Sequence, residues 1–551
     1  MRQLRLAMVA ACLSGVLQQS ANAAVYEVVE MPTQDIAQHS FSASINNSGD
    51  VVLLTDGVFN PPIDVSLLNF ESTTLVDNLT DIDAAQNGNF NTEDLQFLAD
   101  FIQAQSLETF QKLTRYQSFL VSGNNEASFI TGFDTIDPEL GTYARDTNTY
   151  VREINDAGVI VGLGDGPTRK VVYTNESEEE ITYVVQDFNS RGFVQLNGAV
   201  VELVPESDLP GSISEATDVN NNLLVSGYEA TQVTEARQNS IDNCEDDEIR
   251  GDIPVDLCFH RLIRSGVSGA FQRRGALWQL NEAGDILSKK SLGIHFTPEE
   301  DDNNTYISRA LAVNDNGIAV GDASKYFGSN DSIIGMFAAV FKDDEVIGFT
   351  DDSEYNGSVA VDINNNNLVV GQASKTISGY NRTKFFIYDI DNEVVTYPVD
   401  FFPGSASVAH SINDNNLVVG EGEVDAGLSV SRRKHGFIYD VAEQTFQDLN
   451  DLLACDSPYT IVQANSINNS NQIAATAIVN RASYDIKGEA VLDENGDPVT
   501  EDVAVSVILN PVSNGNIEDC APDEQDVQER SGGSMFWLLP LMLLGLFRRR
   551  L

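Results

Sequence analysis

A short asparagine motif that recurs seven times constrains the fold of this chain more than any other feature. In each copy an apolar residue is followed by Asn and then by Asn or Asp, and an apolar pair comes after the next Gly or Asn. The seven motif asparagines are Asn46, Asn155, Asn220, Asn314, Asn364, Asn413 and Asn468. Asn, Asp and Gly tolerate a positive backbone φ, so each copy predicts a tight turn between two short β-strands.

A third and a fourth strand are predicted after several of these hairpins. Aromatic and aliphatic runs such as residues 385–388 and 436–439 indicate the third strand, and residues 445–449 indicate a weaker fourth. Four strands in about fifty residues, without helices between them, are typical of propeller blades. We therefore predict an all-β protein, a β-propeller of about seven four-stranded blades with a small helical insertion. A β-repeat solenoid is the alternative.

The two ends of the repeat region predict how such a propeller closes. Residues 26–29 form an apolar strand without a hairpin partner, and residues 505–509 form the last apolar strand. Pairing these two segments would complete the last blade and hide both strand edges. Contact between the two terminal strands distinguishes a closed propeller from a solenoid.

Parts of the sequence resemble known bacterial repeats. The segment from His435 to Tyr439 is similar to the central motif of HAF-type extracellular repeats, and the asparagine hairpins match their first element. The whole chain also resembles an uncharacterised domain-of-unknown-function family of marine gammaproteobacteria. Asn367, Asn416 and Asn471 replace the Gly of the repeat pattern, which a turn of positive φ permits. These resemblances imply a repeat fold outside the cytoplasm and no particular activity.

The N-terminal residues 1–23 predict a secretory signal peptide. Arg2 and Arg5 precede a short apolar stretch, and a small-x-small pattern ends at Ala23. Cleavage there would leave Ala24 as the first residue of the mature chain.

The C-terminal residues 531–551 predict a sorting tail. Gly532 and Gly533 precede an apolar run that is short for a membrane span, and three arginines follow it. The tail resembles the GlyGly-CTERM signal, which implies transient membrane insertion, cleavage by a rhombosortase-type protease and export by type II secretion. A permanent C-terminal anchor is the alternative. Between the ends we expect one repeat domain at residues 24–515 and an acidic linker at 516–530.

Charge and cysteines narrow the choice of partners and of compartment. The formal net charge is -51, and about −56 without the two ends, so nucleic acids and anionic membrane surfaces are disfavoured as partners. Four cysteines remain after removal of the signal peptide. An even number in an exported chain predicts disulfides, and among the three connectivities we expect Cys244 with Cys258 and Cys455 with Cys520.

A helical insertion is predicted at about residues 92–120, where the apolar residues recur at helical spacing. A calcium loop is a candidate just before it, with oxygen ligands at alternate positions and an acidic residue at the last one. Its ligands would be Asp83, Asn87, Asn89, Asn91 and Asp94, although Ala85 breaks the pattern. The alternative is an Asn-rich loop in which Asp94 or Thr92 caps the helix. Calcium is thus a candidate cofactor, and no other cofactor is expected.

No motif for catalysis is recognisable in the sequence. The histidines lack metal-ligand spacing, and no nucleophile elbow, phosphate loop or dinucleotide fingerprint occurs. We therefore expect an exported cell-surface, outer-membrane or extracellular protein that passes through the periplasm. Its function would be non-enzymatic, either binding an extracellular glycan or protein or serving as a structural module of the envelope. A secreted hydrolase with an acidic active site in the propeller channel is the alternative.

Overall fold

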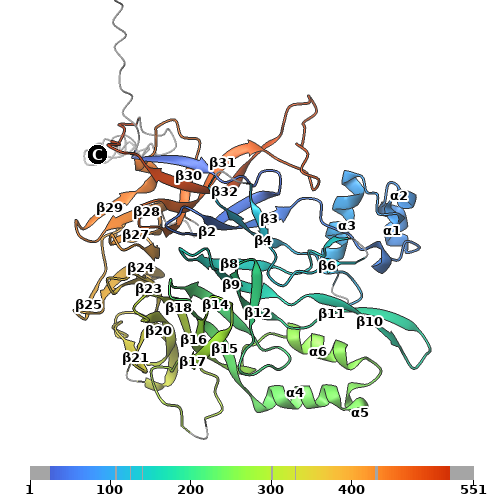
Figure 1. The fold of residues 1–551 in the computed structure, drawn as a ribbon. Coiled ribbons are helices and arrows are strands. Elements are labelled where there is room, and N and C mark those ends of the chain that lie inside the picture. The colour runs from blue at the N-terminus through green and yellow to red at the C-terminus, as the bar shows by residue number, and fades with distance from the viewer. Residues whose placement is uncertain are drawn as a thin grey trace, which may run out of the picture.

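The computed structural model is a propeller of seven four-stranded antiparallel blades (Figure 1). It describes residues 25–520 except 106–107, 124–125, 139–140, 300–301, 329 and 428–431. The predicted signal peptide with Ala23 and Ala24, and the predicted sorting tail with Gly532 and Gly533, lie outside the described residues. No helix among the described residues is long and apolar enough to cross a membrane.

In blades 1 to 6 the strands follow chain order from the channel outward, and in blade 7 the N-terminal strand β1 takes the outermost place. The blades are β2 (Ala37–Ile45), β3 (Val51–Val58), β4 (Tyr116–Val121) and β5 (Ser128–Ile130); β8 (Thr149–Ile154), β9 (Ile160–Asp165), β12 (Ser190–Leu196) and β13 (Ala199–Leu203); β14 (Ser214–Val219), β15 (Leu224–Val233), β16 (Phe271–Leu280) and β17 (Ile286–Ser291); β18 (Ser308–Val313), β19 (Ala319–Phe327), β20 (Asn330–Lys342) and β21 (Glu345–Gly348); β22 (Gly357–Ile363), β23 (Leu368–Ile377), β24 (Tyr380–Asp389) and β25 (Val394–Thr396); β26 (Ser407–Ile412), β27 (Leu417–Glu423), β28 (Lys434–Asp440) and β29 (Thr445–Asp448); and β30 (Thr460–Ile467), β31 (Ile473–Ala482), β32 (Thr500–Pro511) and β1 (Tyr26–Glu30). The first strands of neighbouring blades contact one another around the whole circle, and β30 of blade 7 contacts β2 of blade 1.

The N-terminal strand closes the circle, as predicted. β1 is the outer strand of blade 7 and pairs antiparallel with β32, from Tyr26 opposite Pro511 to Glu30 opposite Val507. In Figure 1 the two strands lie side by side although they come from opposite ends of the sequence. Tyr26 is buried in the core of blade 7. The β-propeller prediction is therefore confirmed, and the solenoid is excluded.

Each inner strand has a β-bulge shortly before its motif asparagine. In blades 2 to 6 the bulge brings the inner strand close to the glycine that follows the apolar pair of the second strand, whereas blades 1 and 7 have Leu53 and Ala475 there. A Cβ atom on Gly321, Gly371 or Gly420 would lie only 1.9–2.1 Å from a carbonyl oxygen of the inner strand. The repeated apolar-apolar-Gly pattern therefore exists because this position has no space for a side chain.

The motif asparagines form a closed ring of hydrogen bonds around the channel. In every blade the Asn Oδ1 accepts the backbone N–H four residues later, which holds the predicted turn. The Nδ2 donates to the backbone carbonyl of the equivalent asparagine in the next blade, at 2.8–3.1 Å, from Asn46 through to Asn468 and back to Asn46. Asn367, Asn416 and Asn471 have φ of +60°, +62° and +61°, so they occupy the Gly position as predicted.

The residues after the motif asparagines form a second ring. They alternate between Asn and Asp around the circle, and each backbone N–H donates to the side-chain oxygen of its counterpart in the next blade at 2.7–3.2 Å. The amide groups of Asn221 and Asn365 each contact the carboxylates on both sides. Because seven is odd, one Asn–Asn junction remains, between Asn469 and Asn47, where blade 7 meets blade 1.

The long insertions lie at the opposite end of the propeller, which we call the insertion face. The asparagine turns join first to second strands, so links from second to third strands, and from blade to blade, emerge at the other end. These links contain α1 (Thr73–Asn78), α2 (Ile82–Gln86) and α3 (Thr92–Ala104); α4 (Glu235–Glu245), α5 (Asp247–Arg250) and α6 (Val255–Arg264); and the hairpins β6 (Ile136–Asp137) with β7 (Thr142–Tyr143) and β10 (Thr168–Thr174) with β11 (Glu180–Gln186). Figure 1 shows both helical groups on one side of the molecule.

The helical insertion differs from its predicted bounds. Instead of a helical pair at about 92–120, three helices occupy residues 73–104, and β4 begins at Tyr116. Phe110 and Leu113 pack against the helices, although they do not lie on a helix themselves. The helical spacing of apolar residues therefore identified residues that share one core, but it did not predict where the helices begin and end.

Both predicted disulfides are present. Cys244 at the end of α4 is bonded to Cys258 in α6, and Cys455 is bonded to Cys520 beyond β32. The first pair joins the two longer helices of the blade 3 insertion. The second ties the chain that follows the last strand to the link between blades 6 and 7. Such bonds fit an oxidising compartment, outside the cytoplasm.

Candidate functional site

A cavity of about 270 Å³ opens on the insertion face, and we call it the rim pocket. Three segments far apart in the sequence enclose it: the first helical insertion, the β6–β7 hairpin and the β10–β11 hairpin. Its walls combine polar side chains with apolar ones such as Leu67, Pro138 and Val184. This mixture of an apolar wall and a few polar groups is typical of small-molecule sites.

The cations at the rim pocket already have carboxylate partners. Lys170 forms an ion pair with Asp64 at 2.7 Å. Arg169 contacts Asp187 at 2.8 Å and also Asp256. Both cationic side chains of the pocket wall are therefore already paired, and neither is left to form an ion pair with a carboxyl group deeper in the wall.

Two buried carboxyl groups, Asp134 and Asp146, lie behind this outer layer. Asp146 is 4% exposed and lines the pocket, and its Oδ2 accepts from the backbone N–H and the hydroxyl of Thr168. Its Oδ1 has no hydrogen-bond partner among the described residues. Asp134 accepts only backbone N–H groups, from Thr135 and Arg145.

The surroundings favour the neutral form of both acids. Burial raises the pKa of Asp134 to about 7, and the neighbouring Asp146 adds to the rise. Burial also raises the pKa of Asp146, against the hydrogen bonds from Thr168 that lower it. Perturbed acids in a cavity are characteristic of functional sites, because stability alone selects against them.

The backbone beside these acids is strained. Arg145 has a φ of +50° without being Gly or Asn, a conformation that costs an L-residue on the order of 1 kcal/mol. Its N–H contacts both oxygens of Asp134 at 3.2 Å, and the buried hydroxyl of Thr147 has no partner among the described residues. Strain and unsatisfied polar groups thus coincide at residues 145–147.

The predicted calcium ligands lie beside a second, larger crevice of about 640 Å³, which Asn87, Asn89 and Lys487 help to line. Asn91 caps α3 by accepting the N–H of Asp94 at 2.8 Å. The carboxylate of Asp94 accepts from Thr80, Asp81 and Asn91. The Nδ2 of Asn87 donates to the backbone carbonyl of Asp83. The side chains of Asn87, Asn91 and Asp94 therefore have partners without an ion, and the calcium site stays a prediction.

The central channel also contains acids. Glu153, Asp218 and Asp362 occupy the same position of blades 2, 3 and 5, two residues before the motif asparagine, and they remain partly exposed to the channel. Asp218 and Asp362 each accept the backbone N–H of the next residue and one from the following blade, donated by Val313 and Ile412. They therefore join neighbouring blades.

Burial raises the pKa of all three channel acids. For Asp218 the rise is to about 7, and for Glu153 the charge of Asp218 adds to it. The channel thus brings together the kind of acidic group that a hydrolase would use, although each acid has a structural partner.

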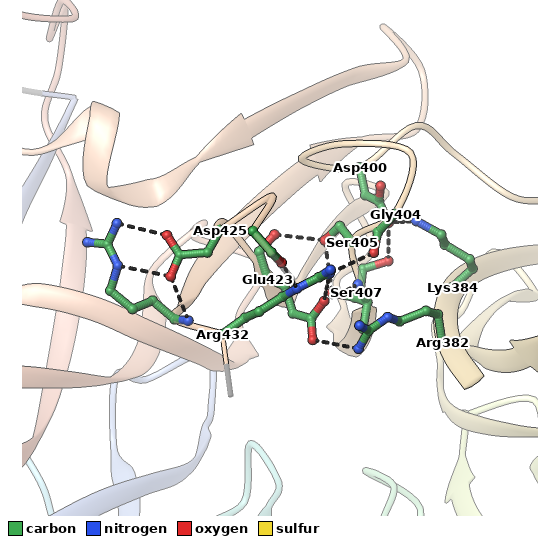
Figure 2. A network of polar contacts seen from close by, with 12 residues as sticks. Arg382, Lys384, Asp400, Gly404, Ser405, Ser407, Glu423, Asp425 and Arg432 are labelled. Carbon is green, nitrogen blue, oxygen red and sulfur yellow. Dashed lines mark hydrogen bonds and ion pairs between the residues drawn. The ribbon is translucent and has the colours of Figure 1, made fainter. Parts of the chain in front are cut away.

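A polar network anchors the loops of blades 5 and 6 on the insertion face (Figure 2). Arg382 and Arg432 both contact Glu423, at 3.1 and 2.7 Å, and Lys384 contacts Asp400 at 2.6 Å. Because every one of these charges is paired and largely buried, the network fixes the loops rather than presenting a free group to a ligand.

Two histidines in contact with neighbouring elements have structural partners. The Nδ1 of His260 accepts the backbone N–H of Gln186, and burial lowers the pKa of this imidazole to about 4. His435 lies 2.6 Å from Asp448 on the neighbouring strand. These contacts tie α6 to β11 and β28 to β29.

Sequence reasoning did not identify Asp134 and Asp146. Neither belongs to a recognisable motif, and the pocket forms only when three insertions meet. One signal existed, because the first two motif asparagines are 109 residues apart, far more than a blade requires. Such surplus chain between repeat units marks the face on which a propeller carries its variable loops.

Comparison with solved structures found chains of low sequence identity. The β-propeller domain of the Trilobed protease from Pyrococcus furiosus is 9% identical, with a TM-score of 0.35 and coverage of 85% of this chain and 97% of that chain. A puromycin-hydrolyzing peptidase from Mycobacterium tuberculosis is 8% identical, with a TM-score of 0.33 and coverage of 85% and 55%. The tricorn protease is 8% identical, with a TM-score of 0.28 and coverage of 86% and 50%. This chain thus spans about half the length of the latter two.

Comparison by sequence gives a clearer result. No curated protein matches the chain. The model of one protein family, however, matches residues 3–550, which is nearly the whole sequence. The chain therefore belongs to the family described as "Protein of unknown function (DUF3466)".

Proposed function

We propose that this protein is an exported propeller that binds an extracellular ligand on its insertion face without converting it chemically. The observation that carries the proposal is the rim pocket, which three separate insertions of the propeller enclose together. A repeat fold needs no such insertions for its stability, since each blade already has four strands. Propeller loops of this kind are where binding residues concentrate.

The sequence ends and the disulfides support export. The signal peptide would direct the chain across the inner membrane, and a rhombosortase-type protease would remove the tail near Gly533 before type II secretion. The two disulfides agree with folding in an oxidising compartment. The protein would then act at the cell surface or in the medium, where glycans and proteins are the available ligands.

Affinity electrophoresis tests the proposal with the purified exported protein in gels that contain extracellular polysaccharides. We expect retardation by at least one polymer. Ala144 lines the rim pocket, and Ala144→Phe should abolish the retardation by filling the pocket. The matched control is Ala157→Phe, at an exposed turn on the opposite face. Equal retardation of both variants and the wild type would place the binding site elsewhere.

The channel acids support a second candidate, a hydrolase active in the channel. Glu153 and Asp218 have raised pKa values, as a general acid requires. The same polymers can be assayed for release of reducing ends. Product that appears with the wild type and not with Glu153→Gln would favour the hydrolase, and retention without product favours the binding protein.

A further inference from the structure

Some acidic side chains around the rim pocket form ion pairs with lysine, and others do not. Asp64 has Lys170 as its partner, and Lys112, whose charge acts on Asp146, forms an ion pair with Asp165 at 2.7 Å. Asp134 and Asp146 have no ion pair with a lysine or arginine side chain in the part of the chain that the structure describes. The charges of Arg145 and Lys112 act on these two carboxyl groups without offsetting the effect of burial, which raises both pKa values.

Asp146 also has an unused hydrogen-bond acceptor. One of its oxygens is held by Thr168, and the other has no hydrogen bond within the described residues. A buried polar atom left without a partner destabilises the fold, because it has lost its hydrogen bonds to water and gained none in return. The protein also maintains the strained φ of Arg145 next to this group. A ligand that donates a hydrogen bond to Asp146 would relieve the first of these costs.

The donor set favours an organic cation over a metal ion. Calcium requires six to eight oxygen ligands around one point. Among the described residues, the one group of three acidic, histidine or cysteine side chains close enough to share an ion is Cys455, Glu518 and Cys520, whose cysteines form a disulfide. An ammonium group needs fewer acceptors. The apolar wall of Leu67, Pro138 and Val184 would contact the remainder of such a ligand.

We propose that the rim pocket binds a small ligand that carries an ammonium group, and that this group donates to the free oxygen of Asp146. Asp134 lies behind it as a second buried acid, and a bound cation would favour the ionised forms of both. The volume of about 270 Å³ accommodates one amino-sugar unit or a molecule of similar size. This inference rests on the proposed function, because it assigns a ligand chemistry to the same pocket.

Isothermal titration calorimetry with glucosamine, glucose, glucuronate and calcium chloride tests the proposal on the exported protein. We expect glucosamine to bind at least tenfold more tightly than glucose, and glucuronate and calcium to give no binding heat at this site. Asp146→Asn should weaken glucosamine binding at least tenfold. The matched control is Asp77→Asn, which changes the net charge equally at an exposed position of α1 and should bind as the wild type does.

Circular dichroism melting of both variants shows whether they are folded, and the ligand series on the wild type needs no variant at all. Equal affinity for glucosamine and glucose, binding of calcium alone, unchanged binding by Asp146→Asn, or no heat with any probe would each overturn the ammonium site. If Ala144→Phe still abolishes polymer retention in those cases, the proposed binding function stands. If it does not, both proposals fail.

Discussion

Asn364 illustrates how one side chain serves two levels of structure. It is 4% exposed, and its Oδ1 accepts the N–H groups of Asn366 and Leu368, which shapes its own turn. Its Nδ2 donates to the carbonyl of Asn413 at 2.9 Å and so joins blade 5 to blade 6. The turn was predictable from the sequence, because Asn and Gly at such spacing have few other uses. The bond to the next blade was not, because it depends on the closure of the circle.

Substitution of Asn364 separates these two roles. Asn364→Ala removes both sets of bonds and should lower the free energy of unfolding by about 2–4 kcal/mol. Asn364→Asp keeps an oxygen that can hold the turn but loses the N–H donor to blade 6. It should therefore be destabilised only by the loss of the bond between the blades. Urea unfolding measures both, with Asn303→Ala in an exposed loop as the control. A stability of Asn364→Ala within 0.5 kcal/mol of the wild type would contradict the role of the ring.

At the scale of elements, strands were easier to predict than insertions. Strand β1 could be assigned to blade 7 because residues 26–29 had no hairpin partner and an open edge is unfavourable. The helices α1 and α2 were missed because each is a single short turn-rich segment, stabilised by packing in a shared core with α3. The rim pocket could not be predicted for the same reason: its three walls have no local pattern in common.

The two disulfides give a prediction at this scale. In the chain-entropy account, a cross-link stabilises more when it closes a longer loop. The separations are 14 residues for Cys244–Cys258 and 65 residues for Cys455–Cys520. Replacing the first pair by serine should therefore cost about 3 kcal/mol, and replacing the second about 4 kcal/mol. Urea unfolding of the two double variants checks the order, and a larger loss for the 244–258 pair would contradict it.

At the scale of the whole molecule, the channel acids exist as a group only because the circle is closed. Glu153, Asp218 and Asp362 come from three blades, and each would be solvated in an open chain. Their raised pKa values mean that, as pH rises, the folded state keeps protons that the unfolded state has already released. Their neutral forms therefore add stability that is complete at acidic pH and declines as pH rises through the folded pKa values.

This coupling predicts the pH dependence of unfolding for Asp218→Asn against the wild type. The variant should be less stable at pH 5, since its amide NH2 group cannot accept a hydrogen bond, whereas both oxygens of the carboxyl group accept one, from Val219 and from Val313. Between pH 5 and pH 8 the gap should narrow by about 3 kcal/mol for a pKa raised from 3.8 to about 7. The comparison of two curves is needed because His260, with its pKa lowered to about 4, adds a slope of opposite sign to both. Parallel curves would show that Asp218 ionises as freely in the folded channel as in the unfolded chain, and the channel would then offer no proton donor for hydrolysis at neutral pH.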